Sequence, residues 1–133
     1  PDARFAEDYL RMLRAARFAA RLGFEVEPRT AAAIRPLAKY LGQISRERIG
    51  MEVAAMLQPP AGRVPAGAAR ARAVELMQSL RLDGIVLNED HLDAPAPTLV
   101  ALPQEAALGT TLAAWMLDRY APGGVDAVQR LID

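Results

Sequence analysis

Residues 5–24, FAEDYLRMLRAARFAARLGF, decide the fold of this chain. At 100° per residue, an apolar stripe runs from Phe5 to Ala20, and the opposite side collects acidic residues and arginines. Gly23 follows, as expected at the C-terminal stop of a helix. The stretch therefore predicts an amphipathic helix from about Phe5 to Leu22, with one buried face and one face that carries polar chemistry.

Shorter amphipathic segments follow and predict further helices. Pro28 suits a first helical turn, and Pro36 is expected to kink or interrupt the same helix. Ser45 is a good N-cap, and Glu47 complements the positive end of the next helix. Short links between the first three helices predict an antiparallel cluster. The later helices are expected over residues 68–82 and 104–120, with a short one after residue 124.

The composition agrees with an all-α multi-helix bundle. Of the residues, 52% are hydrophobic and only 5% are aromatic, with many alanines and few β-branched residues, which favours closely packed helices. The absence of Cys excludes disulfides, and a single His excludes a His-cluster metal site. No apolar run approaches a membrane span and no signal peptide is recognisable, so we expect a cytoplasmic protein without membrane contact. The start at Pro1, without Met, suggests a piece of a longer chain.

A linker divides the chain at residues 58–67, which contain three Pro and two Gly. We predict a first domain over residues 1–60 and a second over residues 61–133. The first carries a net charge of +3 and the second −3. The first is therefore the better candidate for contact with a polyanion.

Asp8 and Arg11 are the residues with the clearest chemistry. On a helix, positions i and i+3 share a face. A carboxylate acceptor beside a guanidinium donor complements the Watson–Crick edge of cytosine or adenine. Guanine and uracil place a carbonyl where the carboxylate needs a donor, and an unpaired buried acceptor costs about 1–3 kcal/mol. From spacing alone, an exposed salt bridge of a few tenths of a kcal/mol is the alternative.

The wider segment resembles one known family. Glu7-Asp8-x-x-Arg11, followed by MLRAARFAARLGF, is similar to the neck motif of class II CCA-adding enzymes and bacterial poly(A) polymerases. The resemblance continues strongly to residue 57 and loosely beyond it; it is carried by residues 28–34, 44–52, 72–77 and 80–82. It implies a neck domain over residues 1–60 and the start of a helical body domain from residue 61.

The resemblance also implies roles for single residues. Asp8 and Arg11 match the positions that hydrogen-bond the base of incoming CTP or ATP, and Glu7 matches an acid that orients an arginine. Arg14 and Arg17 serve substrate phosphate or RNA, or they form ion pairs with an acid; Glu7, Glu47 and Glu52 are the acids available for this.

The family's catalytic step needs Mg²⁺ on a separate head domain. No strand-borne Asp-x-Asp or phosphate loop is present here, so we expect neither a metal site nor a catalytic residue in this chain, and no activity without a head. The expected partners are the 3′ end of tRNA or another RNA, CTP or ATP, and that head domain.

Several alternatives stay open at this stage. The parent enzyme adds CCA, poly(A), only C or only A; outside enzymes, the chain is a stand-alone helical module for RNA or protein binding. Glu89, Asp90, Asp93 and His91 are expected on the solvated surface. Trp115 and Met116 are expected in the core.

Overall fold

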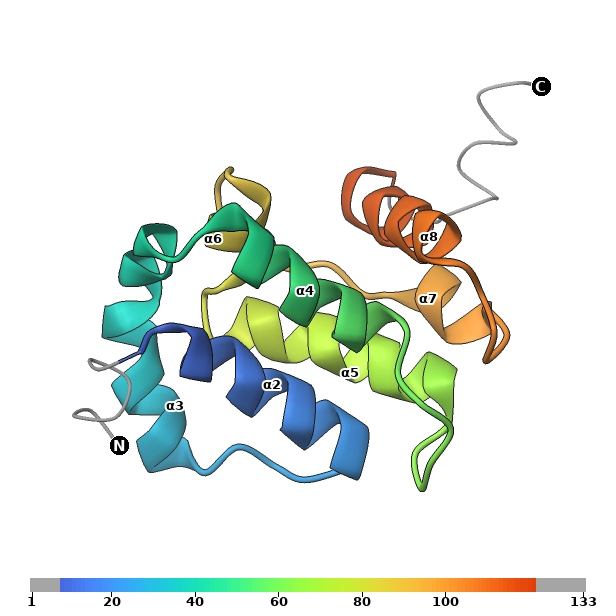
Figure 1. Ribbon diagram of the computed structural model, residues 1–133, viewed down its shortest axis with the longest axis horizontal. Coiled ribbons are helices and arrows are strands. Elements are labelled where there is room, and N and C mark those ends of the chain that lie inside the picture. Colours follow the sequence, from blue (N-terminus) through green and yellow to red (C-terminus); the bar gives the residue numbers. More distant parts are fainter. Residues whose placement is uncertain (1–7, 122–133) are drawn as a thin grey trace.

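The fold is a cluster of helices. In the computed structural model, residues 8–121 are described, and within that range every regular element is helical, as predicted (Figure 1). The elements, in chain order, are α2 (Leu10–Leu22), α3 (Pro28–Ile34), the 3₁₀ helix η1 (Arg35–Gln43), α4 (Arg46–Leu57), α5 (Ala66–Ser79), α6 (Asp83–Leu87), α7 (Pro97–Ala101) and α8 (Leu108–Tyr120).

The ends of α2 follow from local chemistry. Gly23 has φ of 76°, a left-handed conformation that suits glycine, and its N–H donates to the carbonyl of Ala19. At the other end the helix begins at Leu10, so Asp8 precedes it rather than lying within it. Phe5, the predicted start, lies outside the described residues.

The next elements confirm the predicted caps and the break. Pro28 occupies the first turn of α3, and Pro36 stands where α3 gives way to η1. Proline lacks the N–H that an α-helix would bond at this position, which accounts for the change. The Ser45 hydroxyl accepts a hydrogen bond from the N–H of Arg48, and Glu47 lies in the first turn of α4.

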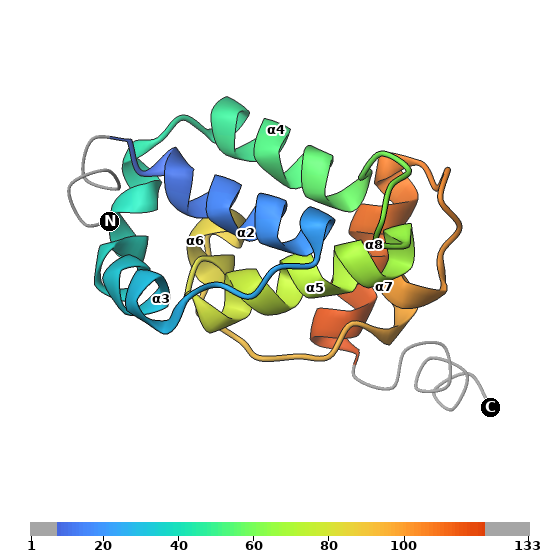
Figure 2. The ribbon, with the colours of Figure 1, turned by 90° about the horizontal axis from the view of Figure 1, so that it is seen from below.

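α2 and α4 run in the same direction (Figures 1 and 2), as the first and third helices of an antiparallel cluster do. The connector at residues 24–27 is extended and returns along the molecule, so that α3 and η1 lie near the start of α2. Tyr9 and Tyr40 stack there with ring centroids 5.4 Å apart. The start of α4 therefore lies beside the start of α2, and the two helices can share ion pairs along their length.

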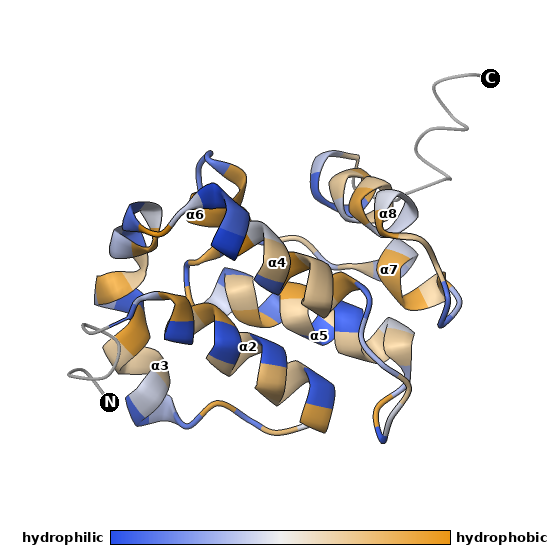
Figure 3. Ribbon diagram, in the orientation of Figure 1, coloured by the Kyte–Doolittle hydropathy of each residue, from blue (hydrophilic) through white to orange (hydrophobic). Residues whose placement is uncertain are grey.

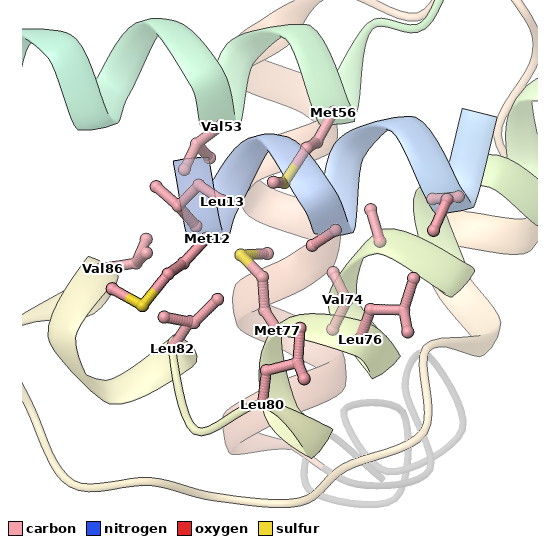
Figure 4. Packing of buried hydrophobic residues seen from close by; sticks show 14 of the residues in the cluster. Met12, Leu13, Val53, Met56, Val74, Leu76, Met77, Leu80, Leu82 and Val86 are labelled. Atoms are coloured by element: carbon pink, nitrogen blue, oxygen red, sulfur yellow. The ribbon is translucent and has the colours of Figure 1, made fainter. Parts of the chain in front are cut away.

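One hydrophobic core joins the two halves of the chain. Met12 and Leu13 of α2 meet Met56 of α4 and Met77 of α5, as Figure 4 shows. All four side chains are at most 3% exposed. The polar positions of α2 and the first turn of α4 lie outside this core (Figure 3). The predicted linker is present as an irregular segment between α4 and α5. Residues before and after this segment pack into the same core. The assignment of residues 1–60 as neck and 61–133 as body stays a prediction.

The second half departs from expectation at its loops. Residues 104–107 are not helical, so α8 starts at Leu108 instead of Gln104. The buried guanidinium of Arg70 explains this, because it donates to the carbonyls of Leu102, Pro103 and Gln104 and fixes them in an irregular path. Trp115 is 1% exposed and lies in the core, as predicted, with Met116 partly buried against it.

The segment between α6 and α7 is held by charges. The prediction that it is solvated surface is wrong for His91, whose side chain is 24% exposed, whereas Glu89 and Asp90 are exposed, as predicted. His91 Nδ1 lies 2.7 Å from Asp83 Oδ1, and Arg119 Nη1 donates to Asp83 Oδ2 at 2.8 Å. Arg119 Nε donates to Glu89 Oε1 at 2.5 Å. Asp93, by contrast, keeps 75% of its side chain exposed, as predicted.

Candidate functional site

Asp8 is fixed at the entrance to α2 from two directions. Its Oδ1 accepts a hydrogen bond from the N–H of Leu10 at 3.0 Å, and its Oδ2 accepts one from Arg48 Nη2 at 3.2 Å. A carboxylate offers about four lone-pair sites, and these bonds use two of them. Since 29% of the side chain is exposed, Asp8 retains the capacity to accept from a ligand.

The same contacts determine the charge of Asp8. Partial burial raises the pKa of this carboxyl, but the hydrogen bond from Leu10 and the hydrogen bond and charge of Arg48 outweigh it. The pKa therefore lies below its ordinary value of 3.8. At neutral pH Asp8 is an anionic acceptor and cannot donate.

Arg11 stands one turn further on and is exposed. Its backbone N–H donates to the carbonyl of Asp8 at 3.0 Å, which ties the two residues together although only Arg11 is helical. The placement of Asp8 within the helix was wrong, because α2 begins at Leu10, and the shared face of Asp8 and Arg11 stays a prediction. The side chain of Arg11 forms no hydrogen bond within residues 8–121. Glu7, the acid expected to orient an arginine, lies outside that range.

Arg14 and Arg17 share one buried acid. Arg14 Nε donates to Glu52 Oε1 at 3.0 Å, and Arg17 Nε donates to Glu52 Oε2 at 2.6 Å. Glu52 is therefore the acid, among the three considered, that pairs with them in the described structure. Each arginine makes this contact through Nε, and its terminal amino groups carry further hydrogen-bond donors.

One residue of the site, Arg48, was not recognised from the sequence as a support of Asp8, whereas Glu52 was among the acids considered for Arg14 and Arg17. Arg48 holds Asp8, and Glu52 holds Arg14 and Arg17; both lie on α4, four positions apart. An i, i+4 pair projects from one face of a helix, but the spacing does not say which residues that face meets.

Other site classes find little support in the part of the chain that is described. No three His, Cys, Asp or Glu side chains within residues 8–121 come together as metal ligands. None of the helices described is both long enough and apolar enough to cross a membrane.

Known proteins share this sequence pattern. The family described as "Probable RNA and SrmB- binding site of polymerase A" matches residues 23–82. A CCA-adding enzyme of Limosilactobacillus fermentum is 53% identical over 57 residues, which are 43% of this chain and 14% of the relative. A CCA-adding enzyme of Streptococcus mutans is 34% identical over 112 residues, 84% of this chain and 26% of the relative. The chain belongs to the tRNA nucleotidyltransferase and poly(A) polymerase family.

Within this nucleotidyltransferase family, the similarity reaches across both halves of the chain. The match to the Streptococcus mutans enzyme covers 112 residues and therefore includes parts of both halves. The match to the family ends at Leu82, just after α5. A CC-adding tRNA nucleotidyltransferase of Halalkalibacterium halodurans is 47% identical over 57 residues, 43% of this chain and 15% of that relative. The chain thus spans about a quarter or less of the length of these relatives. No solved structure matches it.

Proposed function

We propose that this chain is the helical base-recognition and RNA-binding part of an enzyme that adds nucleotides to an RNA 3′ end, with tRNA CCA addition as the activity. The observation that carries the proposal is the position of a fixed, anionic Asp8 one turn before an exposed Arg11 at the start of α2. The names of the relatives from Limosilactobacillus fermentum and Streptococcus mutans support CCA addition.

The pair selects bases by hydrogen-bond type. Asp8 accepts from the exocyclic amine of cytosine or adenine, and Arg11 donates to the adjacent ring nitrogen. Arg48 keeps the carboxylate in place and ionised, and therefore acts as a positioning residue. Guanine and uracil would set a carbonyl against Asp8, at a cost of about 1–3 kcal/mol for the unpaired groups. The protein side chains then take the place of a template strand.

The neighbouring residues have supporting roles in this proposal. Arg14 directs its terminal amino groups to phosphate of the nucleotide, and Glu7 orients an arginine. Attack of the RNA 3′-hydroxyl on the α-phosphate takes place on a head domain that supplies Mg²⁺. In this proposal the chain contributes selection and binding.

Nucleotide selectivity tests the proposal. In the polypeptide that joins this chain to its catalytic head, Asp8→Ala and Arg11→Ala should each reduce the preference for CTP and ATP over GTP and UTP by about tenfold or more. Asp93→Ala and Arg63→Ala, at exposed positions outside α2 and α3, are matched controls and should leave the preference unchanged. Full selectivity in both test variants would refute the base-reading role.

Addition of C alone is a second candidate, favoured by the relative named as a CC-adding enzyme. The Asp8–Arg11 pair serves cytosine and adenine equally, so these residues do not separate the two activities. A tRNA lacking its 3′-CCA, supplied with CTP and ATP separately and together, distinguishes them. Extension by two C with no A identifies the second candidate, and repeated addition of A identifies a poly(A) polymerase.

A further inference from the structure

The outer face of α2 beyond the base-reading pair carries a basic and aromatic surface. The helix contains four arginines and no acidic residue. Phe18 is 44% exposed, and the guanidinium carbon of Arg17 lies 4.5 Å from the centre of its ring. Arg21 is exposed one turn further along. We call Arg17, Phe18 and Arg21 the α2 platform.

The platform is preorganised by the core of the molecule. Glu52, 7% exposed, accepts a hydrogen bond from Arg17 Nε and so fixes the position of this guanidinium group on α2. Arg17 and Arg21 also border a small hollow of about 70 Å³ between α2, α4 and α5. An exposed aromatic ring beside oriented guanidinium groups is the arrangement that binds single-stranded nucleic acid, with bases on the ring and phosphates on the arginines.

We propose that the α2 platform binds the unpaired 3′-terminal nucleotides of the RNA that is extended. This inference rests on the proposed function. Phe18 lies seven residues after Arg11, about 10 Å along the helix axis. The attacking 3′-hydroxyl must approach the nucleotide held at Asp8 and Arg11, so the last RNA nucleotides have to pass close to this face. The positive charges of Arg17 and Arg21 favour a polyanion as the partner. The exposed ring of Phe18 can stack with bases, which favours a nucleic acid over an acidic peptide.

Direct binding to the full 133-residue chain tests the platform. The probe is a fluorescein-labelled single-stranded RNA of about 12 nucleotides, followed by anisotropy. Phe18→Ala should weaken binding about tenfold or more, whereas Phe18→Trp should retain it. Phe24→Ala is the matched control, because Phe24 is also exposed but lies in the connector after α2. Circular dichroism checks that each variant keeps its helices.

The salt dependence tests the arginines separately. Arg17→Gln and Arg21→Gln should each lower the slope of log affinity against log salt by about 0.7, while Arg29→Gln on α3 should not. No RNA binding by the unaltered chain, equal binding by Phe18→Ala, or equal competition by an acidic peptide of the same charge would overturn the inference.

The outcome is separable from that of the proposed function. In the enzyme that contains the head, Phe18→Ala should raise the KM for RNA and leave the preference for CTP and ATP unchanged. An unchanged KM for RNA would contradict the platform alone. Retained selectivity in both Asp8→Ala and Arg11→Ala would contradict the base-reading role whatever the platform does.

Discussion

At the residue scale, Asp83 links three segments of the second half through one buried carboxylate. It is 0% exposed and contacts His91, the N–H of Leu92 and the guanidinium of Arg119. Burial alone raises the pKa of Asp83, but these hydrogen bonds and the charge of His91 lower it below the ordinary value of 3.8. The ionised form therefore stabilises the fold.

We expect the free energy of unfolding to fall in acid because of this group. The lowered pKa of Asp83 means that its contribution is complete above pH 3.8 and is lost as the pH falls through the lower value of the folded state. Urea denaturation between pH 6 and pH 2.5 measures it. Asp83→Asn should lower stability by about 3–5 kcal/mol at pH 6, because Arg119 loses a buried partner.

The variant also provides the control for the pH dependence. Asp83→Asn has no carboxyl to titrate, so its loss of stability in acid should be smaller than that of the unaltered chain. Asp93→Asn, at a position whose side chain is 75% exposed, should behave as the unaltered chain does. Identical acid profiles for the unaltered chain and Asp83→Asn would contradict the assignment.

At the element scale, two glycines in helices stand in opposite surroundings. Gly50 of α4 is exposed, and within the described residues nothing lies within 4 Å of a Cβ built on it. A Cβ at Gly67, in the first turn of α5, would lie 2.2 Å from the carbonyl oxygen of Val100. Gly67 therefore permits the close approach of α5 and α7, and Gly50 only costs helix stability.

The two alanine substitutions should consequently differ in sign. Gly50→Ala should raise the free energy of unfolding by about 0.5–1 kcal/mol, because alanine is the better helix former. Gly67→Ala should lower it by about 1–3 kcal/mol, because backbone must move to admit the methyl group. Chemical denaturation measures both, and each variant is the control for the other. Equal stabilisation by both would show that α5 and α7 are not in close contact.

At the scale of the whole molecule, the shared core predicts that the two halves unfold together. Trp115 is the single tryptophan and is buried in α8, so its fluorescence reports on the second half. Far-ultraviolet circular dichroism reports on all the helices. Because α2, α4 and α5 bury their apolar faces against one another, we expect the two signals to change at the same urea concentration.

Two separated transitions would instead indicate that residues 1–60 and 61–133 are independent domains. Trp115→Phe, followed by circular dichroism alone, shows whether the tryptophan itself disturbs the transition.

The sequence by itself determined the helical class, the caps at Gly23 and Ser45, and the break at Pro36, because each depends on neighbours within a few residues. It also singled out Asp8 and Arg11 through their spacing and the surrounding motif. Only the tertiary structure decided which faces of α2 and α4 meet, and this brings Arg48 to Asp8 and Glu52 to Arg14 and Arg17. It likewise decided that His91 pairs with Asp83. These contacts join residues of different segments. Which residues meet depends on the path of the connectors between the helices, and the periodicity of a single helix does not predict that path.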